Sequence, residues 1–138
     1  MTTPYDTSMN ERLGSWQDRV FDATALPDTA SIESAVFQLG KVQSEVELSI
    51  LANSEITIAD TKSITFELFY DEAEGGSFTD SIVMKAFLAS GSALVLSAGS
   101  TLFNYTPSTD IAQYCKVKVT TTDAQSAGAI DGKLFRTA

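Results

Sequence analysis

From about Ile32 onward, apolar and polar residues alternate with a period of two in several separate segments. The pattern is clearest in three of them, VELSI (46–50), ITFELFY (64–70) and KVKVT (116–120). Because successive side chains of a strand point to opposite faces of a sheet, such alternation places one face in a core and the other in solvent. The sequence therefore predicts an antiparallel all-β fold.

Short segments rich in glycine, serine and proline separate these alternating runs at a steady pace, at 74–77, 90–92, 98–100, 106–108 and 123–128. We expect about eight strands, at roughly 34–39, 44–52, 56–58, 63–71, 80–89, 93–96, 112–122 and 128–136. Eight antiparallel strands in two sheets is the count of a jelly-roll β-sandwich. An immunoglobulin-like sandwich is disfavoured because the spacing of Cys, Trp and Cys is missing.

The first 31 residues lack the alternation, and we predict an irregular, extended N-terminal arm (1–31) before a sandwich domain (32–138). Four apolar residues in the arm have helical spacing. They are Leu13, Trp16, Val20 and Phe21. The spacing is compatible with a short amphipathic helix from about Asn10 to Ala23, which Gly14 weakens.

An arm of this size is too small for a core of its own, so its apolar side chains pack either on the sandwich or on a neighbouring subunit. We identify the same four residues as candidate interaction residues, since Trp is enriched at interface hot spots. On this hypothesis, deleting residues 1–22 weakens docking without unfolding the sandwich.

Composition excludes several classes of chemistry. The chain of 138 residues has no histidine, which removes His-based nucleophilic systems and zinc sites. Its net charge of −9 disfavours a nucleic-acid partner, and no run of apolar residues is long enough to span a membrane. No glycine pattern predicts a phosphate cradle. We expect no catalytic residues, no metal ligands and no cofactor. Cys115, in an alternating run, is expected to be a small buried hydrophobe.

Two sets of acidic residues are candidate sites. Glu45 and Glu47 would lie on one strand face, and Glu67 could join them from a neighbouring strand to supply the two carboxylates of a glycosidase, although the outward face of an amphipathic strand explains them better. The run from Asp71 to Glu74 could ligate Ca²⁺ through oxygen, although it does not follow the order of an EF-hand loop and a solvated turn explains it better.

Two segments resemble the cement proteins of tailed-phage capsids. Residues 23–31 (ATALPDTAS), running into FQLG (37–40), resemble the opening of that family. Residues 112–119 (AQYCKVKV) and 127–134 (AGAIDGKL) resemble its closing hairpin. The resemblance covers about residues 20 to 136, and about 20 additional residues precede it here.

The resemblance implies a jelly roll that assembles as a homotrimer at three-fold positions on the outer capsid surface and binds the major capsid protein. It implies a cement or decoration protein made in the host cytoplasm, with no enzyme activity and no cofactor. Two alternatives remain open from the sequence. One is another virion protein of the tail or neck, and the other is a carbohydrate-binding module built on a β-sandwich.

Overall fold

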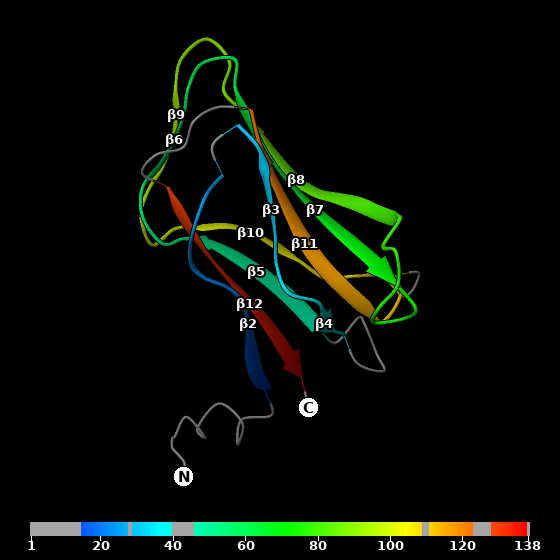
Figure 1. The fold of residues 1–138 in the computed structure, drawn as a ribbon. Helices are drawn as coiled ribbons and strands as arrows, with labels where there is room; N and C mark the ends of the chain where they lie inside the picture. Colours follow the sequence, from blue (N-terminus) through cyan, green and yellow to red (C-terminus); the bar gives the residue numbers. More distant parts are fainter. Residues whose placement is uncertain (1–14, 28, 40–45, 109–110, 123–127, 138) are drawn as a thin grey trace.

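A computed structural model describes residues 15–27, 29–39, 46–108, 111–122 and 128–137 of the chain. Within these ranges the chain forms eleven strands and no helix (Figure 1). Each strand pair is antiparallel. The prediction of an antiparallel all-β fold is confirmed, and no helix of the described ranges could cross a membrane.

Two sheets face each other. The first sheet has the order β10-β5-β12-β2, formed by Thr101–Tyr105, Val46–Ala52, Ala129–Thr137 and Ser15–Ala25. The second sheet has the order β3-β11-β7-β8, formed by Ser31–Glu33, Tyr114–Thr121, Ser63–Asp71 and Asp80–Leu88, and β4 (Phe37–Gln38) also pairs with β11. A separate ribbon joins β6 (Ile56–Ile58) to β9 (Leu94–Leu96).

This strand order is that of a jelly roll. The first and last described strands, β2 (blue) and β12 (red), lie side by side, and β5 covers the other edge of β12 (Figure 1). β3 and β4 pair with β11, which pairs in turn with β7. If β3 and β4 count as one interrupted strand, each sheet has four strands, as a jelly roll requires.

Each of the eight expected strands overlaps a strand of the described residues, and three strands, β2, β3 and β10, were not expected. The segments expected around residues 44–52, 63–71, 80–89, 112–122 and 128–136 correspond to β5, β7, β8, β11 and β12. β3 lies directly before the segment expected at 34–39. The other two, β2 and β10, are edge strands, and the pairing register of each shifts at least once. A bulge inserts an extra residue and breaks the period of two, so alternation could not reveal them.

The helix that was compatible with residues 10–23 is not formed in its described part, because Ser15–Ala25 is strand β2. Trp16, Val20 and Phe21 instead lie on this strand, and the register of its pairing with β12 shifts on either side of Gly132. The sandwich therefore includes residues 15–27 and 29–31, and the predicted arm remains a prediction for residues 1–14, which lie outside the described residues.

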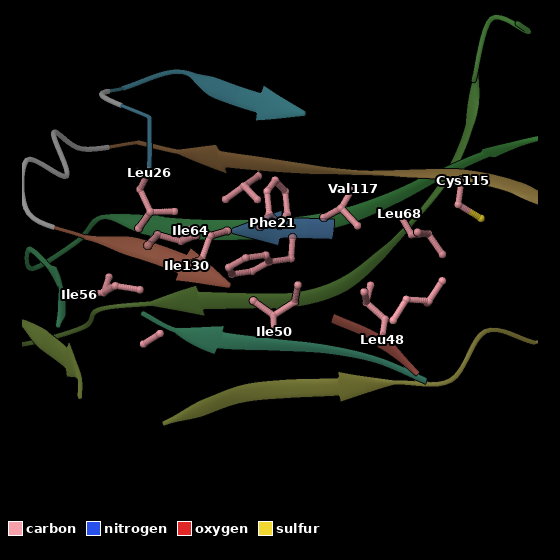
Figure 2. Packing of buried hydrophobic residues seen from close by; sticks show 14 of the residues in the cluster. Phe21, Leu26, Leu48, Ile50, Ile56, Ile64, Leu68, Cys115, Val117 and Ile130 are labelled. Carbon is pink, nitrogen blue, oxygen red and sulfur yellow. The ribbon is translucent and has the colours of Figure 1, made fainter. Parts of the chain in front are cut away.

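The core lies between the sheets (Figure 2). The first sheet contributes Leu48, Ile50, Ile130 and Leu134, and the second contributes Ile64, Leu68, Val117 and Val119, each at most 1% exposed. Phe66 of β7 meets Phe103 of β10 with ring centroids 5.2 Å apart, so an aromatic contact also links the two sheets. The period-two alternation therefore marks the faces that meet in the core.

Candidate interaction surface

Strand β2 holds most of the candidate interaction residues. Phe21 is 4% exposed and belongs to the core, and Val20 packs against that core. These two side chains thus pack on their own sandwich, which is one of the two outcomes the sequence left open. Trp16 lies on β2 opposite Arg136 of β12, and Leu13 lies outside the described residues. For Leu13 and Trp16, contact with a neighbouring subunit stays a prediction.

Gly132 of β12 makes room for Phe21. A Cβ atom at position 132 would lie 3.0 Å from Cδ2 of Phe21 and 3.2 Å from its backbone nitrogen. It would also lie 3.1 Å from Cδ1 of Ile50. Gly132 therefore leaves room for the ring of Phe21 at the point where this ring approaches the backbone of β12.

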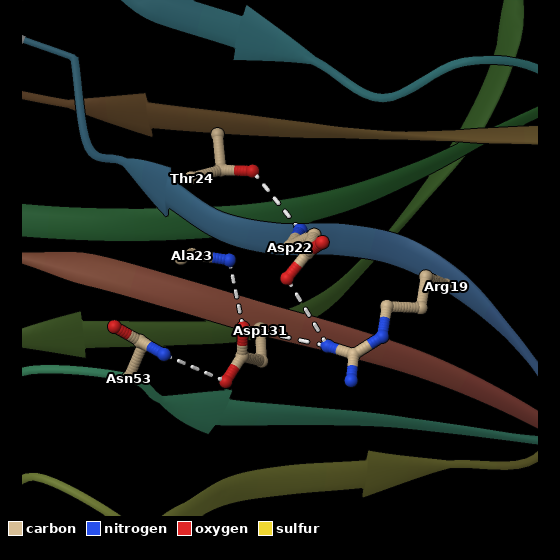
Figure 3. Close-up of polar contacts among 6 residues, drawn as sticks. All are labelled: Arg19, Asp22, Ala23, Thr24, Asn53 and Asp131. Atoms are coloured by element: carbon tan, nitrogen blue, oxygen red, sulfur yellow. Dashed lines mark hydrogen bonds and ion pairs between the residues drawn. The ribbon is translucent and has the colours of Figure 1, made fainter.

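Asp131, the preceding residue, holds the irregular end of β2 (Figure 3). Its carboxylate accepts a hydrogen bond from the backbone N–H of Ala23 at 2.8 Å and another from the side-chain amide of Asn53 at 3.1 Å. Ala23 has a φ of 49°, a left-handed conformation that costs free energy for a residue with a Cβ. The Ala23 N–H, then the Asn53 amide, lower the pKa of Asp131. The carboxylate thus joins β2, β12 and the segment after β5.

Of the acidic residues that could serve a glycosidase, the two that the structure describes do not meet. Glu47 projects from the outer face of the first sheet, between the buried Val46 and Leu48. Glu67 projects from the outer face of the second sheet, where its carboxylate accepts a hydrogen bond from the Ser81 hydroxyl at 2.7 Å. The two sheets and the core separate these carboxylates, and Glu45 lies outside the described residues. The structure therefore does not bring Glu47 and Glu67 together.

The acidic turn after β7 is organised by its own backbone. The Asp71 carboxylate accepts hydrogen bonds from the backbone N–H groups of Ala73 at 3.0 Å and Phe78 at 3.2 Å. These bonds, with that to Ala73 the largest, lower the pKa of Asp71. A Cβ at Gly76 would overlap the same carboxylate. Among the described residues no three His, Cys, Asp or Glu side chains gather closely enough to hold a metal.

Cys115 is fully buried, and burial raises the pKa of its thiol to about 12. It occupies the core-facing row of β11, as alternation predicted. Such a thiol stays protonated and unreactive at neutral pH.

The outer face of the second sheet carries lysines over aromatic rings. The Lys118 ammonium lies 5.6 Å from the ring centre of Phe69, and the Lys116 ammonium lies 5.1 Å from that of Phe78. Lys116 also forms an ion pair of 3.0 Å with Glu33. Both lysine ammonium groups thus already contact partners within the chain, so we expect this part of the face to be a solvated surface.

Apolar side chains reach solvent mainly along β8. Ile82, Val83 and Leu88 are 41%, 55% and 65% exposed, and Val95 on β9 is the fourth large apolar residue exposed among the described residues. The sequence predicts a strand here but no interaction surface. The available signal was that β8 is apolar at neighbouring positions, which one buried face cannot accommodate.

No protein-family model and no curated protein matches this sequence. Solved structures of infectious bursal disease virus show a weak similarity in fold. The Gx strain structure is 13% identical with a TM-score of 0.43, and the VP2 subviral particle is 12% identical with a TM-score of 0.42. Each match covers 88% of this chain and 31% of the viral chain, so this chain spans less than a third of their length.

A crystal structure of PirA is 13% identical with a TM-score of 0.29, and the match covers 91% of this chain and 94% of that chain.

Proposed function

We propose that this chain is a structural protein of a virus particle, a cement or decoration subunit on the outer surface of a tailed-phage head. In this role it binds the major capsid protein and stabilises the contacts between capsomers. It assembles as a homotrimer, is made in the host cytoplasm, and acts without enzymatic activity, cofactor, nucleic acid or membrane.

The main support is the place of the two segments that resemble cement proteins. They are separated by about 70 residues in the sequence, yet short strands of one pair with strands of the other. β2 pairs with β12 through Ala25 and Ala129, β3 pairs with β11 through Ile32 and Val119, and β4 pairs with β11 through Phe37 and Cys115. The resemblance therefore falls on one continuous unit of the fold.

Bonds outside the ladders strengthen this unit. The backbone N–H of Leu26 donates to the carbonyl of Gly128 at 3.0 Å, and the hydroxyl of Thr121 donates to the carbonyl of Pro27 at 2.9 Å. The N–H of Leu39 donates to the carbonyl of Gln113 at 2.8 Å. These bonds hold the opening segment against the closing segment in both sheets.

The jelly-roll topology supports the proposal by analogy with other proteins that have this fold. Viral capsid domains and lectins both use it. A carbohydrate-binding module displays aromatic rings on its surface, whereas Tyr70, Phe87, Phe103 and Tyr105 pack against this core and Phe78 is 6% exposed. The burial of these rings favours a virion protein over a carbohydrate-binding module.

The physical task of a cement subunit fits a rigid sandwich. Packaged DNA pushes outward on a capsid, and a subunit that bridges neighbouring capsomers resists that expansion. Three copies in one trimer multiply a weak single contact through effective concentration. An extended segment can add contact area and pays for its ordering when it binds.

Labelling of purified virus particles tests the proposal. An antibody against this chain, detected by electron microscopy of intact particles, should decorate the outer surface of the head. Label confined to the tail or neck would favour the alternative virion role, and absence of the chain from purified particles would refute both.

The arm can be tested separately. Because β2 spans Ser15–Ala25, the deletion that leaves every described strand intact is 1–14 rather than 1–22. We expect the chain that lacks residues 1–14 to co-sediment with heads more weakly than the full chain. Equal binding by the two proteins would show that residues 1–14 take no part in docking.

A further inference from the structure

β8 forms one edge of the second sheet. Its residues pair with β7 from Asp80↔Tyr70 to Leu88↔Ser63, and no strand of the described residues pairs with its other side. An edge strand presents N–H and C=O groups that can pair with another strand. With nine residues, β8 is long enough to offer several such groups.

The other edges are less suited to pairing. β3 and β4 have three and two residues, and β10 has five with a register shift. β2 is longer, but its ladder shifts twice and its edge carries the exposed ion pair of Arg19 and Asp22. Short length and repeated register shifts limit edge pairing, whereas β8 has nine residues and a single register shift.

β8 combines its free edge with apolar side chains on both faces. Ile82 pairs with Leu68 and so belongs to the row that faces the first sheet, whereas Val83 pairs with Glu67 on the outer row. Both are more than 40% exposed. A strand added beside β8 would cover both side chains at once, which packing against one face alone would not do.

A bulge places two opposite charges in the same row of β8. The ladder passes from Lys85↔Phe66 to Val83↔Glu67, so Met84 is the extra residue. Asp80 pairs with Tyr70 and Lys85 pairs with Phe66, and both partners pack in the core-facing row of β7. Without the bulge, residues five apart would point to opposite faces.

This arrangement is complementary to itself. If two β8 strands run antiparallel about a two-fold axis at Ile82, then Ile82 meets Ile82, and Ser81 meets Val83. Asp80 of each copy then lies beside Met84 and Lys85 of the other. A two-fold contact repeats each pair, so two Asp–Lys pairs flank an apolar centre.

We propose that β8 is a self-association edge, through which the second sheets of two copies join into one continuous antiparallel sheet. The contact adds no net charge between copies, because each contributes one carboxylate and one ammonium, whereas the chain as a whole carries −9 and repels itself. The bulge and Lys85 hinder pairing with unrelated strands. They allow the register in which Lys85 of one copy lies beside Asp80 of the other. This two-fold contact leaves the trimer contacts proposed above to other surfaces.

Sedimentation velocity of the purified chain tests the inference, with Val83→Lys as the variant and Val95→Lys as its matched control. Both valines lie on strands and are similarly exposed, at 55% and 51%. We expect Val83→Lys to halve the mass of the largest species, whether that species is a dimer or a pair of trimers, and Val95→Lys to leave it unchanged. A monomer or single trimer in the unmodified chain, or equal effects of both variants, would overturn the proposal.

Exchanging the charges tests the register. Asp80→Lys and Lys85→Asp should each weaken the two-fold association about tenfold, since two cross-strand pairs become repulsive. The double variant Asp80→Lys/Lys85→Asp restores both pairs and should recover the association. A double variant as weak as the single ones would reject this register. Because no virus particle is present, these results are independent of head binding, so either proposal can fail alone.

Discussion

Gly132 has no side chain, which allows the ring of Phe21 to approach the backbone of β12. Gly132→Ala should lower the free energy of unfolding by about 1–3 kcal/mol, because the new methyl group overpacks the core and one of its neighbours is the backbone of Phe21. Urea denaturation gives the value. Gly75→Ala is the control, since a Cβ there meets no atom within 4 Å, and we expect a change below about 0.5 kcal/mol.

One residue earlier, Asp131 stabilises the fold through its ionised form. Its folded-state pKa is lowered, so its contribution is present above the unfolded value near 3.8 and is lost as the pH falls through the folded pKa. In Asp131→Asn the side-chain amide cannot accept from both Ala23 and Asn53. We expect a loss of about 1 kcal/mol at pH 7 and a smaller loss at pH 3, measured by urea denaturation. The same loss at both pH values would contradict this role.

At the scale of elements, β2 is a part of the sandwich rather than of a loose arm. Deleting residues 1–22 removes most of β2 and the buried ring of Phe21, which should cost about 3–5 kcal/mol or more. Deleting residues 1–14 should leave the thermal midpoint nearly unchanged, because it keeps the whole of the described β2–β12 ladder, from Ser15 to Ala25. Calorimetry of the two truncated chains compares them. Equal midpoints would place β2 outside the cooperative unit.

Other elements show how edges differ within one fold. β7 and β11 are central and follow the period of two without interruption, and they form an unbroken ladder of eight residue pairs. β2, β8 and β10 lie at edges, and each has a register shift. A bulge is easier to accommodate where one side of a strand has no ladder to disturb.

At the scale of the whole molecule, Cys115 reports on the integrity of the sandwich. It lies on the core side of β11, fully buried, and its thiol has a pKa of about 12. We expect the thiol not to react with Ellman's reagent at pH 8 in the native protein and to react fully in 8 M urea. Rapid reaction without denaturant would mean that the two sheets separate locally at β11.

The sequence alone was enough to predict an antiparallel sandwich of jelly-roll type, the central strands and the burial of Cys115. These features depend on which residues are apolar and on the period of two, and both are local properties. The same local information suggested a helix near residues 10–23. It could not show that Ser15–Ala25 completes a sheet whose partner strand, β12, lies more than a hundred residues away.

Only the tertiary structure decided which faces and edges remain uncovered. Ile82 and Leu68 are both apolar residues of strands, yet one is 41% exposed and the other 1%. Their difference comes from the position of β8 at the edge of its sheet and of β7 inside it. Exposure depends on what other parts of the chain cover, so the period of two predicted the layers but not the surface available to a partner.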